Sequence, residues 1–224
     1  MSDEARDWRA TGQEIVDQVY GLLGCVTRAL DAAGVEYAIA AGTLLGAVRH
    51  GGLIPWDDDA DLYVLASQQD RLNAARPELD RAGVTLHPWF FGFKACGYLG
   101  APWGEAAERM TYPTVDMFVL DDRVADAMPL ACPRAHALWP NEHVYADEWR
   151  SRVPTRFGNA HFSGFGASES EGYLARMYGP NWRVETFEVW DHLNDVPAER
   201  VPLPLPTTRC ALPRAGCYLH PLRA

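Results

Sequence analysis

Several features that are common in proteins are scarce or absent in this 224-residue sequence. Only one lysine, Lys94, occurs among 20 basic residues, and 30 acidic residues give the chain a net charge of −10. An acidic chain is a poor candidate for holding nucleic acid by general neutralisation of phosphates. The five cysteines are scattered and form no CxxC pair. The sequence therefore predicts neither a disulfide framework nor a zinc knuckle.

Long apolar segments are also missing. No apolar run reaches the roughly 20 residues that a membrane span needs. The N-terminus lacks the basic flank and apolar core of a secretory signal, so we expect a cytoplasmic protein. The hydrophobic content of 48% is ordinary for a globular domain. Composition changes after residue 196, which predicts a domain at residues 1–196 and a Pro/Arg-rich extension at residues 197–224.

Hydrophobic periodicity predicts helices and strands in a mixed arrangement, of either the α/β or the α+β type. The clearest helix covers residues 11–33, where Thr11 and Glu14 have the spacing of a capping box. Further helices are expected at residues 67–82 and 168–178. Strands are expected at residues 35–41, 84–87, 89–96 and 115–120 and at the end of residues 54–64, and a Gly/Pro/Glu-rich connection at residues 97–109.

Carboxylates with strand spacing are the first candidates for chemistry. Asp59 and Asp61 are two residues apart at an expected strand start, so their side chains point to the same face. Two such carboxylates repel each other and persist at little cost only at a water edge or around a cation. Asp116, isolated in an apolar strand, would add a third oxygen ligand or a base. Carboxylate oxygens suit Mg²⁺, with Mn²⁺ as an alternative. An acidic surface loop at residues 57–59 is the competing interpretation.

Other residues are candidates for binding phosphate. Gly42 and Thr43 stand between an expected strand and a helix, where backbone N–H groups and a hydroxyl can face a phosphate. Arg49 and His50 are further candidates, although a helix end that favours cations explains them equally well. Lys94 either reaches a phosphate or extends from a sheet edge. A metal site beside an anion cradle is typical of phosphoryl-type transfer.

The segment that contains most of these candidates resembles the signature of the LicD family. It covers residues 41–61 and reads AGTLLGAVRHGGLIPWDDDAD. The family includes bacterial phosphorylcholine transferases and the fukutin-related ribitol-phosphate transferases. The sequence VDMF at residues 115–118 resembles the second acidic strand of the family, and YLARMYG at residues 173–179 resembles its closing helix. The resemblance covers about residues 35–185.

The resemblance implies an α+β fold of the nucleotidyltransferase type, in which helices flank a mixed β-sheet. It assigns Gly42 and Thr43 to phosphate binding, and Asp59, Asp61 and Asp116 to the metal and to catalysis. The implied reaction transfers a phospho-alcohol, such as phosphocholine or ribitol phosphate, from a CDP-activated donor to a hydroxyl of a glycan or a small molecule. Modification of a cell-surface glycan is the process that such a reaction would serve.

Two alternatives to this function stay open. One is a nucleotidyltransferase that moves a nucleoside monophosphate onto a small molecule or a protein. The other is a non-catalytic scaffold that binds a nucleotide, which the complete set of three acids disfavours. Neither residues 97–109 nor residues 123–152 contain a motif that identifies the alcohol or the acceptor, and the oligomeric state is equally open.

Overall fold

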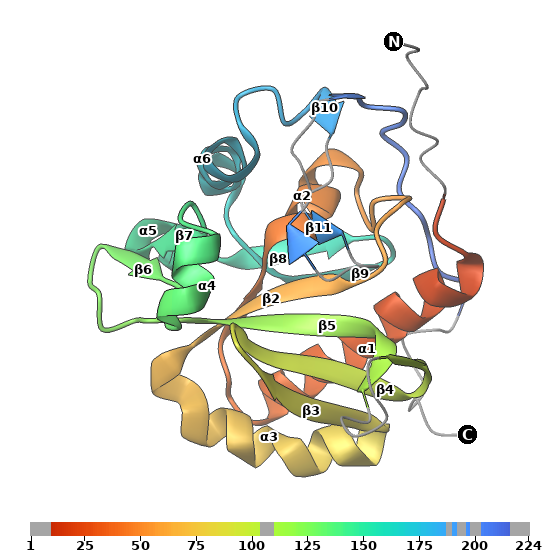
Figure 1. The fold of residues 1–224 in the computed structure, drawn as a ribbon, viewed down its shortest axis with the longest axis vertical. Helices are drawn as coiled ribbons and strands as arrows, with labels where there is room; N and C mark the ends of the chain where they lie inside the picture. Colours follow the sequence, from red (N-terminus) through yellow and green to blue (C-terminus); the bar gives the residue numbers. More distant parts are fainter. Residues whose placement is uncertain (1–9, 104–109, 187–189, 192–195, 198–202, 216–224) are drawn as a thin grey trace.

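A mixed β-sheet forms the centre of the computed structural model, which describes residues 10–103, 110–186, 190–191, 196–197 and 203–215. The strand order is β1-β2-β5-β4-β3 (Figure 1). The pair β2–β5 is parallel, and the other neighbouring pairs are antiparallel. The bounds of these strands are β1 Tyr37–Ile39, β2 Ala60–Leu65, β3 Val84–Trp89, β4 Gly92–Trp103 and β5 Met110–Leu120.

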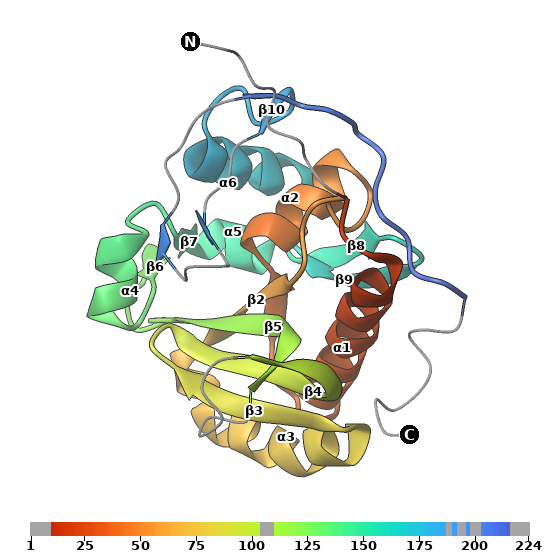
Figure 2. The ribbon, with the colours of Figure 1, turned by 45° about the vertical axis from the view of Figure 1, so that its right-hand side comes forward.

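Two long helices, α1 (Gln13–Ala32) and α3 (Gln69–Ala82), cover one face of this sheet (Figures 1 and 2). The apolar stripe of α1 is fully buried against the sheet and includes Val19, Leu23 and Leu30. A 3₁₀ turn, η1 (Ala66–Gln68), precedes α3, and Gly83 ends α3 in the left-handed conformation at φ 81°. Burial of this stripe, rather than helix propensity alone, holds α1 in place.

The remaining elements lie beside β1 and β2 or over the face of the sheet that α1 and α3 leave open. Helix α2 (Ala41–Arg49) contacts β2 and α6 (Ala167–Tyr178), and the hairpin of β8 (Val153–Phe157) and β9 (Ala160–Gly164) contacts β1. The shorter elements are β6 Ala127–Pro129, α4 Pro133–Leu138, β7 His143–Tyr145, α5 Ala146–Arg150, β10 Glu185–Thr186, β11 Trp190–Asp191, β12 Val196–Pro197 and β13 Leu203–Pro204. The predicted α+β class, a mixed sheet flanked by helices, is confirmed.

Two local predictions were wrong. The capping box at Thr11 and Glu14 does not form, because Gly12 is the N-cap of α1 and makes no side-chain bond. The Thr11 hydroxyl instead donates to the backbone carbonyl of Asp57 at 2.8 Å, which ties the start of α1 to the acidic loop. The connection predicted at residues 97–109 begins later, because β4 continues to Trp103 by pairing with β5 across a register shift. Residues 104–109 lie outside the described residues.

Residues 203–215 form an extended C-terminal strap that packs on the domain. The strap joins β10 through β13, bridges Leu53 through Ala211, and ends in an ion pair between Arg214 and Asp17 of α1. The division of the chain at residues 196 and 197 stays a prediction. Within the described ranges, no helix combines the length and the apolarity that crossing a membrane requires.

Tyr20 of α1 connects the strap to the loop after α2. Its hydroxyl donates to the carbonyl of Ala211 and accepts the buried N–H of Leu53, both at 2.9 Å. Gly52 is required beside it, because a Cβ at that position would lie 2.5 Å from the Tyr20 hydroxyl oxygen.

We expect Tyr20→Phe to lower the free energy of unfolding by about 1–3 kcal/mol, because the N–H of Leu53 loses its buried acceptor. The ring contact with Phe157, at 5.0 Å between centroids, is preserved, so the loss reports the hydroxyl. Urea unfolding of both proteins measures the difference. A change smaller than about 0.5 kcal/mol would show that this hydroxyl does not hold the strap to the loop.

Candidate active site

Three predicted site residues lie in one row across the sheet. Asp61 of β2 is the register partner of Asp116 of β5, and Asp116 is the register partner of Lys94 of β4. Register partners share a face, so the three side chains stand on the same side of the sheet. The opposite face carries Phe93, whose ring lies under the guanidinium of Arg76 from α3. The row therefore stands on the face that α1 and α3 do not cover.

Asp116 is a buried carboxylate with two partners inside the sheet. The Nζ of Lys94 lies 2.6 Å from one carboxylate oxygen, and the Thr114 hydroxyl donates to the other at 2.8 Å. Lys94 and Asp116 are 9% and 6% exposed, so this ion pair is screened little by water. The Nζ of Lys94 also lies 5.2 Å from the centre of the Phe91 ring. The only lysine of the sequence is therefore the counter-charge of Asp116.

Asp61 makes two hydrogen bonds with the first turn of α2, accepting one and donating the other. Its side-chain oxygen Oδ2 accepts the N–H of Gly42 at 3.0 Å, and its own backbone N–H donates to the Thr43 hydroxyl at 2.7 Å. A Cβ at Gly42 would lie 3.0 Å from an Asp57 oxygen and 3.3 Å from the Asp61 oxygen. In this structure Gly42 thus leaves room for two carboxylates. The predicted binding of phosphate by Gly42 and Thr43 stays a prediction.

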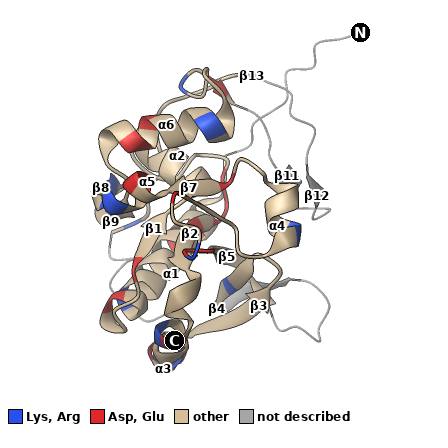
Figure 3. Cartoon of the chain, turned by 90° about the vertical axis from the view of Figure 1, so that its left-hand side faces the viewer, with Lys and Arg blue, Asp and Glu red and all other residues tan. Residues whose placement is uncertain are grey.

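The acidic loop before β2 brings further carboxylates to the row. One oxygen from each of Asp57, Asp58 and Asp59 can be chosen so that all three lie within 4.8 Å of one another. The Tyr112 hydroxyl donates to Asp58 at 2.6 Å. Asp59 immediately precedes β2. This strand starts at Ala60, one residue later than the strand start that was predicted at Asp59. Figure 3 shows acidic positions in red beside β2 and β5.

These carboxylates raise one another's pKa values. The pKa of Asp59 is raised well above its ordinary value by burial and by the neighbouring charges of Asp61 and Asp57. The pKa of Asp61 is raised in the same way by burial, by Asp116 and by Asp57. Burial and neighbouring charges thus disfavour the ionised carboxylates at the start of β2, and a bound cation would relieve this cost.

Arg49 and His50, at the end of α2, are bonded to C-terminal segments. The Nη1 of Arg49 donates to the carbonyls of Trp182 at 2.8 Å and Glu185 at 2.9 Å. The Nε2 of His50 lies 3.1 Å from the carbonyl of Thr207 in the strap. Burial lowers the pKa of Arg49 to about 10 and that of His50 to about 4, so His50 is neutral at pH 7. Their predicted contact with phosphate stays a prediction.

Glu142 is a buried acid that the sequence did not single out. It lies in the loop before β7, is 4% exposed, and accepts the Tyr63 hydroxyl at 2.7 Å. Tyr63 stands two residues after Asp61 on the same face of β2. Burial raises the pKa of Glu142 to about 7, and its charge in turn raises the pKa of Asp61. No motif surrounds Glu142, so only the tertiary contact reveals it.

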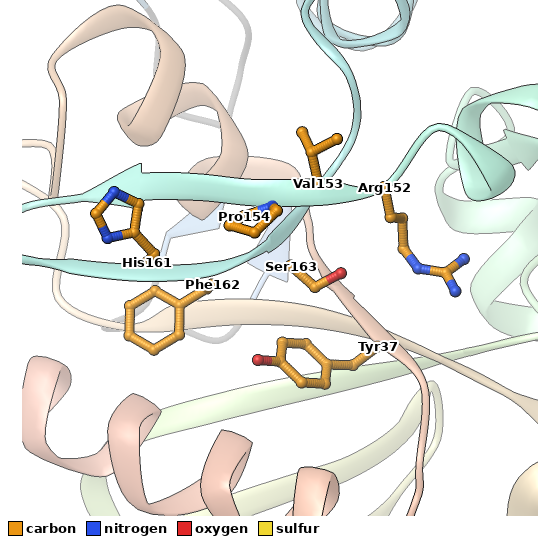
Figure 4. A pocket seen from close by; sticks show the side chains of 7 residues that line it. All are labelled: Tyr37, Arg152, Val153, Pro154, His161, Phe162 and Ser163. Carbon is orange, nitrogen blue, oxygen red and sulfur yellow. The ribbon is translucent and has the colours of Figure 1, made fainter.

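A shallow cavity of about 280 Å³ lies away from this row, between β1 and the β8–β9 hairpin (Figure 4). Tyr37, Arg152 and His161 are among its lining residues. Arg152 is already paired with Glu36 at 2.6 Å and lies over the Trp149 ring. None of the predicted site residues lines this cavity, so it adds nothing to the site.

We expect Lys94→Met to lower the free energy of unfolding by about 3–5 kcal/mol in a chelating buffer, because Asp116 is left as an uncompensated buried charge. The double variant Lys94→Met with Asp116→Asn should recover much of the loss, because the buried charge is removed with its partner. Urea unfolding of the three proteins measures both effects. Equal losses in the single and double variants would contradict the pairing.

The raised pKa values also predict the pH dependence of stability. A carboxyl whose pKa is higher in the folded than in the unfolded chain binds more protons when folded, so stability falls as the pH rises above about 4. Without divalent cations, the change in stability from pH 5.5 to pH 8 should be less unfavourable in Asp61→Asn than in the wild type; His50, whose pKa is lowered to about 4, acts in the opposite direction in both proteins. Urea unfolding at both pH values tests this, with the exposed Asp126→Asn as the control. An unchanged slope in Asp61→Asn would contradict it.

The segment that contains most of the site residues is similar in sequence to known proteins. Residues 34–123 match the family model described as LicD/FKTN/FKRP, nucleotidyltransferase domain. The chain is 34% identical over 87 residues to the protein RP689 of Rickettsia prowazekii, an alignment that covers 38% of this chain and 32% of that protein. It is 49% identical over 37 residues to the lipopolysaccharide cholinephosphotransferase LicD of Haemophilus influenzae, covering 16% of this chain and 14% of that enzyme.

A human relative and one solved structure extend the comparison. The human ribitol 5-phosphate transferase FKRP is 60% identical over 39 residues, which is 17% of this chain and 8% of that protein. The solved structure, ANT(2")-Ia with adenylyl-2"-tobramycin, shares 14% identity and covers 66% of this chain and 68% of its own, with a TM-score of 0.40. The chain spans less than half of the length of the curated relatives that it matches. These matches confirm the predicted resemblance to the LicD family, whose nucleotidyltransferase-domain model matches residues 34–123.

Proposed function

We propose that this protein is a divalent-cation-dependent transferase that moves a phospho-alcohol from a CDP-activated donor to a hydroxyl of a sugar or glycan. One observation carries the proposal: Asp61 and Asp116 stand side by side on parallel strands, and Asp59, immediately before β2, is close enough for the charges of Asp61 and Asp116 to raise its pKa. The names of the relatives, a cholinephosphotransferase and a ribitol 5-phosphate transferase, support a phospho-alcohol as the transferred group.

The side chains present suit a hard cation such as Mg²⁺ or Mn²⁺. The donor atoms are carboxylate oxygens, which these ions prefer, and burial together with mutual repulsion raises the pKa values of Asp59 and Asp61. Asp59, Asp61 and Asp116 would hold the ion, and Asp57 is close enough to Asp61 to influence its pKa. When bound, the cation would neutralise charge on the diphosphate of the donor.

In the proposed reaction, the acceptor oxygen forms a bond to the phosphorus that bears the alcohol, and the bond from that phosphorus to CMP breaks. CMP is the leaving group, and the proton of the acceptor hydroxyl passes to a carboxylate of the cluster. Gly42, Thr43, Arg49 and His50 are proposed to contact the donor phosphates, while Lys94, which is buried against Asp116, would hold that carboxylate in place.

The alternative reaction is attack at the other phosphorus of the donor, which would transfer the nucleoside monophosphate itself. The description of the matched model as a nucleotidyltransferase domain gives this reading its support. The same carboxylates would serve both reactions, so the product distinguishes them. Mass spectrometry of the acceptor after incubation with a CDP-alcohol shows whether a phospho-alcohol or CMP has been added.

We expect CDP together with Mn²⁺ to stabilise the wild type by about 2.7 kcal/mol at 100 times its dissociation constant. Asp61→Asn should abolish this stabilisation, because a neutral amide binds a divalent cation more weakly than a carboxylate does. In chelator, the same variant should be at least as stable as the wild type at pH 8, because it removes one of the crowded charges. Thermal and urea unfolding with and without each ligand measure both effects.

Two controls make this test decisive. The exposed Asp126→Asn variant should respond to CDP and Mn²⁺ like the wild type, because residue 126 lies outside the carboxylate row. ATP and UDP in place of CDP test whether cytidine is preferred. Equal responses of Asp61→Asn and the wild type would refute the cation site.

A further inference from the structure

A buried series of hydrogen bonds next to the carboxylate row joins four separate segments of the protein. Glu142, in the loop before β7, accepts the Tyr63 hydroxyl at 2.7 Å. The hydroxyls of Tyr63 and Tyr173 lie 2.7 Å apart, and the N–H of Ala41 donates to the Tyr173 hydroxyl at 3.2 Å. Tyr63 and Tyr173 are fully buried, on β2 and α6. The chain therefore runs from a loop acid to the first residue of α2.

The direction of this chain is fixed by the number of hydrogens available. Tyr63 has one hydroxyl hydrogen and donates it to Glu142, so the hydrogen between the two tyrosines must come from Tyr173. Tyr173 therefore has only its oxygen to offer Ala41, whose backbone N–H can only donate. Each donor is used once, and Glu142 is the terminal acceptor on which the order of the whole chain depends.

The start of α2 needs such a support. Ala41 adopts φ 36°, in the left-handed region that residues other than glycine rarely occupy. Its N–H is one of those that a helix cannot satisfy internally. The next N–H, that of Gly42, is taken by the Asp61 carboxylate. The strained turn is thus held on one side by Tyr173 and on the other side by Asp61 itself.

The geometry points to Glu142 as a positioning residue that acts through Tyr63 and Tyr173 on the first turn of α2, and so fixes the orientation in which Asp61 binds its cation. This inference rests on the proposed function. Glu142 touches neither the cation nor the substrate in this role. Glu142 accepts the hydrogen of Tyr63, so the Tyr173 hydroxyl donates to Tyr63 and its oxygen is left to accept the N–H of Ala41. Tyr63 also connects Glu142 to β2, the strand that bears Asp61.

The test measures Mn²⁺ affinity by isothermal titration at a temperature where every variant is folded. Glu142→Leu and Tyr173→Phe should each weaken binding by about tenfold or more, the effect typical of residues that orient a ligand. Glu142→Gln should stay within about threefold of the wild type, because its amide oxygen accepts the same hydrogen. A purely structural role would lower stability in these variants without changing the affinity of the folded protein.

The chain offers a matched control in Tyr37, another buried tyrosine, on β1. Its hydroxyl bonds to residues 27 and 163 rather than to the start of α2, so Tyr37→Phe should leave Mn²⁺ affinity unchanged. If Glu142→Leu does not fold, Tyr63→Phe and Tyr173→Phe decide the question, because both keep the ring packing. Wild-type affinity in those variants overturns the inference.

A second readout separates this inference from the proposed function. In the metal-free protein, the amide of Ala41 should exchange its hydrogen at least tenfold faster in Tyr173→Phe and Glu142→Leu, and at the wild-type rate in Glu142→Gln. If the wild type binds no Mn²⁺, the proposed function fails, and amide exchange alone judges the hydrogen-bond chain. Unchanged exchange in Tyr173→Phe refutes it.

Discussion

Repulsion among carboxylates is the constraint on which the arrangement of this site depends. Asp57, Asp59 and Asp61 approach one another at the start of β2, and Asp116 joins them from the neighbouring strand. Each carboxylate would be expensive to bury alone. The fold therefore surrounds them with donors from several elements: an ammonium from β4, a backbone N–H from α2, and hydroxyls from β5.

The donors only partly compensate for this charge. Lys94 neutralises Asp116, yet the pKa values of Asp59 and Asp61 remain raised, first by burial and then by the charges of neighbouring carboxylates. A protein optimised only for stability would replace such a cluster by neutral or apolar residues. A cation-binding site instead requires several carboxylates close together. The cost of clustering them therefore supports the proposed chemistry.

Much of this arrangement could be predicted from local patterns. The helix predicted at residues 11–33 follows from its apolar stripe, and the strand bearing Asp116 follows from its apolar neighbours, because these signals depend on residues close in sequence. The approach of Asp116 to Asp61 was predicted because a carboxylate in an apolar strand needs a partner, and the family resemblance implied the same, but nothing in either strand specifies its neighbour or the register. Helix ends were predicted less well: Thr11 has capping spacing, but its hydroxyl finds the carbonyl of Asp57, a partner 46 residues away.

Contacts between distant segments account for what the sequence could not show. Glu142 stands in a stretch without a motif and acquires its role only when β2, α2 and α6 assemble around it. The partners of Arg49 and His50 were equally hidden, because these side chains contact carbonyls of residues more than 130 positions away. Such partners leave no trace in local periodicity or spacing.

The burial of Lys94 has a consequence for the covalent chemistry of the whole molecule. This residue is the only lysine in the sequence, and its amine is 2.6 Å from Asp116 beneath the acidic loop. Acylating reagents need an accessible amine, and this residue is only 9% exposed and is bonded to the Asp116 carboxylate. Reagents that modify lysine on most proteins would thus find no exposed lysine to react with here. Labelling of Lys94 would serve as a direct signal that the ion pair has opened.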